Sequence, residues 1–352
     1  MQKYDHAFGK NDIRGIYQGD ITEELFYNIG IGYTKWLINN NNKDVNDLRI
    51  SVCMDARLHS PSLKLALING LKDCGVGYIE DLGLAPTPIG YYSEIAHNLD
   101  GAMIITASHN PSEYNGLKMT YNRQTLNEKQ IKEVKELTYS NWTSMPKSLE
   151  NYNFNTEILS EYIAEMKEKF GEIGKGIKVV VDSANATGGV VGPQLYKELG
   201  CEVIELFSEP DGRFPNHHPN PSVLSTLETL SKTVVEYKAD LGIAFDGDSD
   251  RVLAVDENGN IIGGCLAEVY CWNIMFIDIL WFDEAYRKQG LGSQMLQEME
   301  RIAGEKNCTL IHLDTYDFQA KDFYLKHGFE VFGVLEDCPP GHCRYFLKKS
   351  LK

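Results

Sequence analysis

Residues 101–111 read GAMIITASHNP, which joins an apolar run of strand length directly to a polar loop. Apolar, β-branched runs of the same kind recur at residues 49–55, 77–82, 177–183, 202–207, 240–245 and 251–257. Stretches with helical periodicity alternate with them, at residues 22–38, 60–73, 128–137, 156–170 and 224–237. This alternation is typical of α/β layers with largely parallel strands, so we expect an α/β fold.

Length and composition bound the class of protein. The 352 residues are enough for two or three domains of about 150 residues each. The hydrophobic fraction of 43% and the charged fraction of 24% are typical of folded proteins and exclude a disordered, collagen-like or disulfide-scaffold chain. With 34 basic and 50 acidic residues, the net charge of -16 repels phosphate backbones and anionic lipids. We therefore expect no nucleic-acid partner and no membrane association.

The sequence carries no membrane-spanning or secretory signal. The longest apolar stretch, residues 269–282, contains Asn273 and Asp278 and is shorter than the ~20 residues that a spanning helix needs. The first 15 residues lack the apolar region of a signal peptide, and the eight cysteines lie mostly inside apolar runs, as reduced thiols do. We expect a cytoplasmic protein. The cluster CPPGHC at residues 338–343 favours a turn over a metal site.

Ser108 and His109 directly follow the apolar run of residues 101–107. The carboxyl end of a strand is where α/β proteins place catalytic groups, so the position favours function. A hydrolase triad is a poor interpretation, because adjacent side chains usually point apart and the loop has no G-x-S-x-G motif. Taken alone, the loop also fits a turn that happens to contain Ser and Asn.

A second loop carries three carboxylates at alternate positions, Asp246, Asp248 and Asp250, after the apolar run of residues 240–245. Clustered carboxylate oxygens suit Mg²⁺ or a similar hard cation. An EF-hand calcium loop is the rival interpretation, but its sixth position requires Gly where this chain has Arg251, and the flanking segments are strands. A structural acidic turn is the other alternative. Three close carboxylates repel one another unless a cation lies between them.

Two cations complete the set of candidate groups. Arg14 lies in FGKNDIRG at residues 8–15, and Lys118 ends YNGLK at residues 114–118. Arginine provides a bidentate fork for an anion, and lysine provides an amine that can move a proton. Each alone reads as a surface cation. With a loop serine and an acidic loop they form the parts needed for phosphoryl transfer.

Residues 1–258 resemble the first two domains of the α-D-phosphohexomutases, the phosphomannomutase and phosphoglucomutase family. The resemblance rests on several long motifs in the family's order: FGKNDIRG (8–15), DAR (55–57), GLAPTP (83–88), TASHNPSEYNGLK (106–118), the turn at 185–189, PDGRFPNHHPNP (210–221) and FDGDSDR (245–251). The motif PDGRFPNHHPNP contains His217 and His218, and its place in the family pattern makes a separate metal site there unnecessary.

The resemblance implies a mechanism. Ser108 would be a phosphoserine that donates its phosphate to a hexose phosphate, and the hexose bisphosphate would turn round and return the other phosphate. By the same resemblance, Asp246, Asp248 and Asp250 would hold Mg²⁺ together with Ser108. His109 and Lys118 would be candidates for proton transfer. Arg14 and Arg251 would assist electrostatically. The family's third and fourth domains, which read the sugar and clamp its phosphate, have no counterpart in this sequence. We therefore expect impaired turnover.

Residues 261–352 have a different character: a hydrophobic strand, then RKQGLG at 287–292, then an amphipathic helix. Glycines at such a turn expose backbone N–H groups that can bind pyrophosphate. A dinucleotide fingerprint fails because Met295 occupies its third glycine position, and a glycine turn without a ligand is the remaining alternative. The segment, including the stretch FYLKHGF at 323–329, resembles the C-terminal part of the GNAT acetyltransferases.

That second resemblance implies acetyl-CoA as a cofactor. Its pyrophosphate would bind the turn formed by Arg287, Lys288, Gln289, Gly290, Leu291 and Gly292, and Tyr324 would protonate the leaving thiolate. The family's N-terminal strands and helices, which help to bind the acceptor, have no counterpart here, so the acceptor is not readable from the sequence.

Taken together, the sequence predicts two successive phosphohexomutase-type α/β domains, at residues 1–150 and 151–260, followed by a partial GNAT-like α/β segment at residues 261–352. We expect phosphotransfer on hexose phosphates through a hexose bisphosphate. The alternatives are an acetyl-CoA-dependent N-acetyltransferase in the C-terminal segment, or a non-catalytic protein that binds a phosphosugar or CoA. The junction near residues 258–262 fits a natural fusion, a gene-model error or an engineered crossover equally well.

Overall fold

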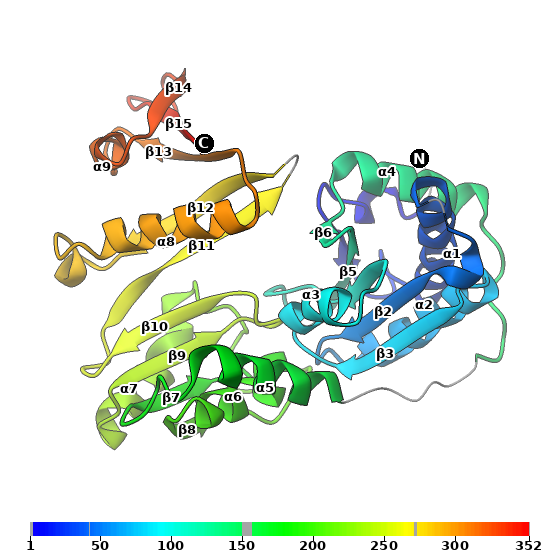
Figure 1. The fold of residues 1–352 in the computed structure, drawn as a ribbon, viewed down its shortest axis with the longest axis horizontal. Helices are drawn as coiled ribbons and strands as arrows, with labels where there is room; N and C mark the ends of the chain where they lie inside the picture. The colour runs from blue at the N-terminus through cyan, green and yellow to red at the C-terminus, as the bar shows by residue number, and fades with distance from the viewer. Residues whose placement is uncertain (1–2, 42, 150–156, 271–272, 352) are drawn as a thin grey trace. The chain divides into compact units, whose positions relative to one another are not determined.

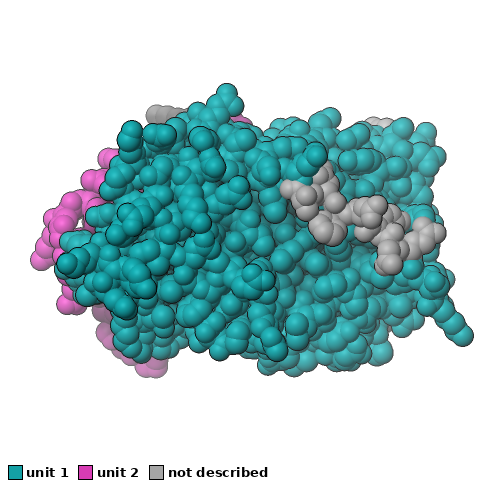
Figure 2. Space-filling model, turned by 90° about the horizontal axis from the view of Figure 1, so that it is seen from below, with its two compact units in different colours: residues 1–260 teal, residues 261–352 magenta. Residues whose placement is uncertain are grey.

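Figure 1 shows the helices and strands of the chain. The structure, a computed structural model, describes residues 3–41, 43–149, 157–270 and 273–351. The chain divides into two compact units, Met1–Asn260 and Ile261–Lys352, which Figure 2 distinguishes by colour. The first unit contains the Ser108 loop and the acidic loop, and the second contains the glycine turn.

The first sheet of the first unit has the strand order β1-β5-β4-β2-β3, with β6 paired to β5. Its strands are β1 (Ile13–Ile16), β2 (Arg49–Met54), β3 (Tyr78–Leu84), β4 (Gly101–Ile105), β5 (Tyr114–Tyr121) and β6 (Gln124–Thr125). The central strand β2 runs parallel to β3 and β4, whereas β5 runs antiparallel to β4 and β1. The loop from β4 to β5 is too short for the crossover that a parallel pair needs, which explains why the sheet is mixed.

Helices cover both faces of this sheet. They are α1 (Glu23–Asn40), α2 (Ser60–Asp73), α3 (Thr87–Ala96) and α4 (Glu128–Ser140), with short 3₁₀ turns at Asp5–Ala7 and Val45–Asp47. Because strand side chains alternate between faces, Ile50 and Val52 of β2 join the core under α1 and α2, and Cys53 joins the core beside α3. The hydroxyl of Thr22 accepts the amide N–H of Leu25 and so caps α1, as its position before the helix predicts.

The second part of the first unit has the strand order β8-β7-β9-β10. It consists of α5 (Glu157–Phe170), β7 (Lys178–Asp182), a 3₁₀ turn (Thr187–Val190), α6 (Gly192–Glu198), β8 (Glu202–Leu206), a 3₁₀ turn (Leu224–Leu227), α7 (Glu228–Tyr237), β9 (Leu241–Phe245) and β10 (Val252–Asp256). Strand β7 is parallel to β8 and β9, and β10 is antiparallel to β9. The sequence boundary region at residues 139–154 is partly helical in α4, and its residues 150–154 lie outside the described residues.

The second unit is a sheet with the strand order β14-β15-β13-β12-β11 and two helices. Its elements are β11 (Ile261–Tyr270), β12 (Ile274–Phe282), a 3₁₀ turn (Glu284–Tyr286), α8 (Leu291–Glu305), β13 (Leu310–Tyr316), α9 (Lys321–Lys326), β14 (Glu330–Leu335) and β15 (Arg344–Ser350). The apolar run after residue 261, expected to be one strand, is an antiparallel pair. Asn273, at a positive φ of 60°, directly precedes the return strand, and asparagine tolerates that conformation better than apolar residues do. None of the described helices combines the length and the apolar character needed to cross a bilayer.

Candidate active site

Ser108 lies in the loop that leaves β4, and its side chain is buried. Its backbone is in the left-handed region, with a φ of 51°, which residues other than glycine rarely adopt. The amide of Ser108 donates to Oγ1 of Thr106 at 2.8 Å. The hydroxyl Oγ lies 3.0 Å from Oδ2 of Asp246, a residue on the other sheet of the first unit. The two loops singled out from the sequence therefore meet.

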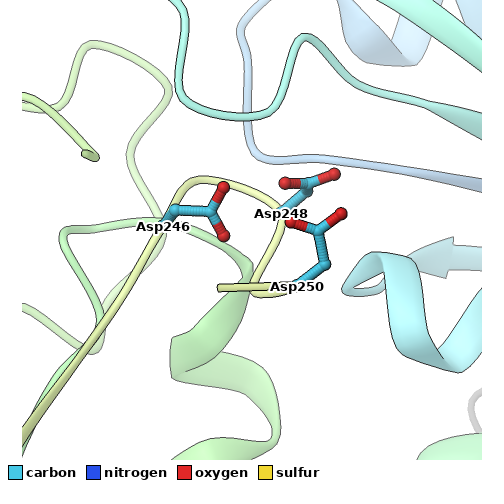
Figure 3. A group of neighbouring side chains, drawn as sticks. All are labelled: Asp246, Asp248 and Asp250. Atoms are coloured by element: carbon cyan, nitrogen blue, oxygen red, sulfur yellow. The ribbon is translucent and has the colours of Figure 1, made fainter. Parts of the chain in front are cut away.

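The acidic loop connects β9 to β10, and Figure 3 shows its three carboxylates projecting from one turn. One oxygen from each of Asp246, Asp248 and Asp250 lies within 4.8 Å of the others. Gly247 lets the loop approach the serine closely, because a Cβ at this position would lie 2.4 Å from the carbonyl oxygen of Ser108. The flanking elements are strands, which removes the EF-hand interpretation.

Lys118 reaches the acidic loop from β5. Strand alternation places its neighbours Leu117 and Met119 in the core and turns Lys118 to the opposite face. Its Nζ lies 2.7 Å from Oδ2 of Asp248 and 2.7 Å from Oδ2 of Asp250. Burial opposes the charged ammonium, but these two carboxylates outweigh burial and raise the pKa of Lys118 well above its usual value. Lys118 is therefore a charged hydrogen-bond donor in this arrangement.

The carboxylates of the acidic loop differ in protonation because their neighbours differ. Burial, followed by the charges of Asp248 and Asp250, raises the pKa of Asp246 well above its usual value. Burial also acts on Asp248, but Lys118 and the hydroxyl of Thr87, 2.7 Å away, hold its pKa below the usual range. Added positive charge in the loop would favour the ionised form of all three acids.

The acidic loop fits a divalent cation on its own geometry. Within the described residues, Oδ1 of Asp248 is a buried oxygen without a hydrogen-bond partner. An unpaired buried carboxylate oxygen is costly, and a cation satisfies it. The residues that could hold the ion are Asp246, Asp248, Asp250 and the hydroxyl of Ser108. Among the described residues this is the one group of three or more His, Cys, Asp or Glu side chains arranged to bind a metal, so CPPGHC is not such a group.

His109 and Arg251 also lie beside Ser108 and the acidic loop. Nδ1 of His109 is 3.2 Å from Oγ of Ser108 and 2.8 Å from Nη1 of Arg251. Burial, then the charges of Arg251 and Arg14, lower the pKa of His109 to about 4. Because a guanidinium only donates, Nδ1 is an acceptor and the imidazole is neutral.

Arg14 borders the same loop without touching Ser108. Its Nη1 donates to Oδ1 of Asn110 at 3.1 Å and its Nη2 to Oδ2 of Asp12 at 2.5 Å. Sequence reasoning did not single out Asn110 or Thr87. Thr87 lies in the GLAPTP turn after β3, at the same edge of the sheet as Ser108, and that shared edge was the available signal.

The glycine turn of the second unit leads into α8. Gly290 occupies the position before the helix with a φ of 87°, and a Cβ added there would meet no atom within 4 Å. The side chains of Arg287 and Gln289 fold back onto the loop, donating to the carbonyls of Phe282 at 2.8 Å and Ala285 at 2.7 Å. Lys288 is exposed, whereas Leu291 and Gly292 form the first turn of the helix. The amides of that turn have no side-chain cap.

Tyr324 of α9 is buried in the same unit, and burial raises its pKa to about 12. Phe323 beside it packs on Gly292, where an added Cβ would lie 3.1 Å from the ring. A contact that the sequence did not reveal joins the same two helices, since Nε2 of His327 lies 2.8 Å from Oγ of Ser293. These contacts bring α9 against the beginning of α8.

Comparisons with known proteins show to which family the first unit belongs. Residues 5–143 match the family model "Phosphoglucomutase/phosphomannomutase, alpha/beta/alpha domain I", and residues 160–259 match the model for domain II. Over these residues the chain belongs to the phosphoglucomutase/phosphomannomutase family. The phosphomannomutase/phosphoglucomutase of Pseudomonas syringae pv. tomato is 41% identical over 261 residues, which cover 73% of this chain and 53% of that protein.

Two further matches agree. The protein of the same name from Pseudomonas aeruginosa PAO1 is 40% identical over 258 residues, 72% of this chain and 53% of its own. A crystal structure of a phosphoglucomutase/phosphomannomutase family protein from Burkholderia thailandensis is 30% identical with a TM-score of 0.63, and the match covers 73% of this chain and 56% of that one. The chain spans about half the length of the curated relatives that it matches.

The C-terminal region matches another family. Residues 222–329 match the model "Acetyltransferase (GNAT) family", so this match overlaps that of domain II over residues 222–259 and continues into the second unit. The chain thus combines two phosphohexomutase domains with a GNAT domain.

Proposed function

We propose that the first unit transfers a phosphoryl group through Ser108, in the manner of a phosphohexomutase acting on a hexose phosphate. The observation that carries the proposal is the 3.0 Å contact between Oγ of Ser108 and the acidic loop. In the reaction a bond between a hexose-phosphate oxygen and the phosphorus forms as the bond from Ser108 Oγ breaks. The hexose bisphosphate then returns its other phosphate to Ser108, so the atoms balance over the cycle.

The surrounding residues suit this reaction. Asp246, Asp248, Asp250 and Ser108 would hold Mg²⁺, which supplies positive charge against the phosphate when it is bound. Lys118 holds a proton close to the acidic loop and Arg251 places a guanidinium beside His109. Neutral His109, whose Nδ1 lies 3.2 Å from Oγ, would accept a proton from the hydroxyl of the sugar or of Ser108 when Nδ1 exchanges its bond from Arg251 for that proton.

The rate of a complete mutase cycle on this chain is a separate proposal. The chain covers 53% of the first relatives' length, and their remaining length would provide other contacts to the sugar. Correct positioning of a substrate accounts for ~7 to 11 kcal/mol of a barrier. We therefore expect the chain as given to isomerise hexose phosphates many orders of magnitude more slowly than its relatives, while phosphate exchange at Ser108 survives.

The first test is phosphate mapping. Incubation with a hexose 1,6-bisphosphate and Mg²⁺ should place one phosphate on Ser108, and Ser108→Ala should abolish the label. Ser112→Ala is the matched control, because Ser112 is exposed in the same loop and should leave labelling unchanged. Absence of phosphate on Ser108 in the parent protein, both as purified and after incubation, contradicts the proposal.

A second candidate function is acetyl transfer from acetyl-CoA by the C-terminal region. The observation that favours it is the uncapped first turn of α8, preceded by Gly290 in the left-handed conformation with open space around it. Tyr324, with its pKa of about 12, would be protonated at neutral pH and able to give a proton to the leaving thiolate. A protein that binds CoA without turnover remains the non-catalytic alternative, and acetyl-CoA hydrolysis or transfer measured beside binding separates the two.

The cytoplasm is the location that we propose. The described cysteines are all free thiols, which fits a reducing compartment. Fractionation of cells that produce the chain tests this, and recovery in a secreted fraction contradicts it.

A further inference from the structure

Arg57 is a buried arginine that the phosphotransfer scheme does not use. It lies in the turn between β2 and α2 and is 1% exposed. A buried guanidinium is tolerated only when its charge and its N–H groups are paired. Its Nε donates to Oδ2 of Asp55 at 2.9 Å, and Asp55 in turn accepts the hydroxyl of Ser60 at 2.7 Å. The charge is therefore matched at one edge of the guanidinium.

The other edge binds the backbone of the phosphoserine loop. Nη2 donates to the carbonyl oxygens of Ser108 at 2.9 Å and Asn110 at 2.8 Å. Nη1 donates to the carbonyl oxygens of Tyr114, at 3.0 Å, and Pro111. A guanidinium has five N–H donors, and all of them are thereby used. One side chain spans the whole loop from the reacting serine to the start of β5.

The loop needs such support. The left-handed backbone of Ser108 is sparsely populated for a residue with a Cβ and persists only where its surroundings hold it. Arg57 binds the carbonyl of this residue, while Thr106 binds its amide. Phe214 of the 210–221 segment covers the guanidinium, with its ring centre 5.4 Å from Cζ of Arg57.

Another Asp-x-Arg pair in the chain shows that the pattern itself does not create this arrangement. Arg213 donates through Nε to Asp211, two residues earlier, as Arg57 does to Asp55, but its Nη2 also binds Asp211, whereas Nη2 of Arg57 binds the Ser108 loop. Arg213 is exposed, with 72% of its side chain accessible. The local geometry is shared, but only Arg57 is buried against the phosphoserine loop. Arg213 is therefore a matched control within the same unit.

We propose that Arg57 is a positioning residue for phosphoryl transfer: by binding four carbonyls of the loop, it fixes the backbone that aims Oγ of Ser108 at the acidic loop. Arg57 touches no reacting atom and acts through Ser108. The inference rests on the proposed function of Ser108, and its test includes a measurement that does not depend on that function.

The central variant is Arg57→Lys, which keeps the positive charge beside Asp55 but cannot span four carbonyls. We expect the single-turnover rate of Ser108 phosphorylation by a hexose 1,6-bisphosphate to fall by roughly tenfold to a hundredfold, with little change in the concentration of bisphosphate that gives half the maximal rate. Arg213→Lys should leave the rate within about twofold of the parent. If Arg57→Ala folds, added guanidinium ion should restore part of its rate.

Hydrogen exchange provides the measurement that is independent of activity. In Arg57→Lys the amides of residues 106–115 should exchange at least about tenfold faster than in the parent, whereas those of α2 should not change. Normal exchange in this loop, or a normal phosphorylation rate in a folded Arg57→Lys protein, overturns the inference. A third outcome separates the two proposals. If the parent protein is not phosphorylated but the loop exchanges faster in Arg57→Lys, the proposed function is contradicted and the role of Arg57 in holding the loop is supported.

Discussion

The candidate sites of the two units are built in different ways. In the first unit, Ser108 follows β4, Lys118 lies within β5 and the acidic loop follows β9. Ser108 contacts Asp246 and Lys118 contacts Asp248, each across more than 100 positions of sequence. In the second unit, the glycine turn is a local feature whose chemistry lies in the backbone conformation of Gly290 and the amides of α8. The first site depends on which side chains are present, and the second depends on which backbone φ values are allowed. A substitution should therefore weaken the first site by removing a functional group, and the second by changing the backbone conformation.

The largest effect is expected at Asp248 of the first unit. Asp248→Asn removes a carboxylate charge from the centre of the acidic loop, so Mg²⁺ affinity should fall by roughly 100-fold or more. Isothermal titration of the intact chain with Mg²⁺ measures this. Asp47→Asn, at an exposed position of the same unit, is the control and should leave affinity unchanged. Equal affinity in Asp248→Asn and the parent would show that the loop is a structural acidic turn.

An intermediate effect is expected at Gly290 of the second unit. Gly290→Val forces a β-branched residue into the left-handed region and should weaken acetyl-CoA binding by at least about tenfold. Gly341→Val is the matched control, because Gly341 has a φ of 84° and equally open space, so it carries the same backbone strain away from the turn. Equilibrium binding of acetyl-CoA compares the two variants. Equal losses in both would mean that strain on the unit, and not the turn, controls binding.

The smallest effect is a pH-dependent stability of the first unit. His97, at the end of α3, lies 2.9 Å from Glu80 of β3 through Nδ1 and 2.8 Å from Glu161 of α5 through Nε2. Partial burial opposes the imidazolium, but these carboxylates outweigh it and raise the pKa of His97 above the ordinary 6.5. Stability from this contact is therefore fully present below about pH 6.5 and is lost as the pH rises through the folded-state pKa.

The measurement is denaturant unfolding of the parent and His97→Gln between pH 5 and pH 9. The difference should be about 0.5–1 kcal/mol at low pH, after screening by solvent, and should shrink as the pH rises. Other charged groups of α5 face the same region, namely Glu165, Glu168 and Lys169, and are present in both proteins. His6→Gln, which removes one contact to Asp20, is the control. If the difference in the free energy of unfolding between the parent and His97→Gln grows as the pH rises, the stabilising role of protonated His97 is contradicted.

Local sequence patterns predicted the elements well where neighbours along the chain determine them. The apolar run at residues 49–55 and the helix at residues 60–73 occur as β2 and α2, because burial alternation and a helix start are readable locally. The antiparallel direction of β5 and the hairpin of β11 and β12 were not predicted. Both depend on how a short connection folds back, which apolar periodicity does not encode.

The sequence predicted which residues belong to the candidate site but not which of them are in contact. Ser108 and Asp246 could be selected from motifs, yet their 3.0 Å contact is set by the packing of two sheets. A comparison of Arg57 with Arg213 makes the limit clear: both follow the Asp-x-Arg pattern, and only tertiary packing makes Arg57 buried. Sequence reasoning from single motifs cannot separate such a pair.

The position of Ser108 between the two sheets has an electrical consequence. Its hydroxyl comes from the first domain and its partner Asp246 from the second. If Ser108 carried a phosphate, up to two negative charges would lie opposite the carboxylates of the acidic loop, and a bound dication would offset their repulsion. The contact between the two domains at Ser108 would therefore be electrostatically more favourable with a dication bound, and phosphorylation of Ser108 would increase that dependence on the cation.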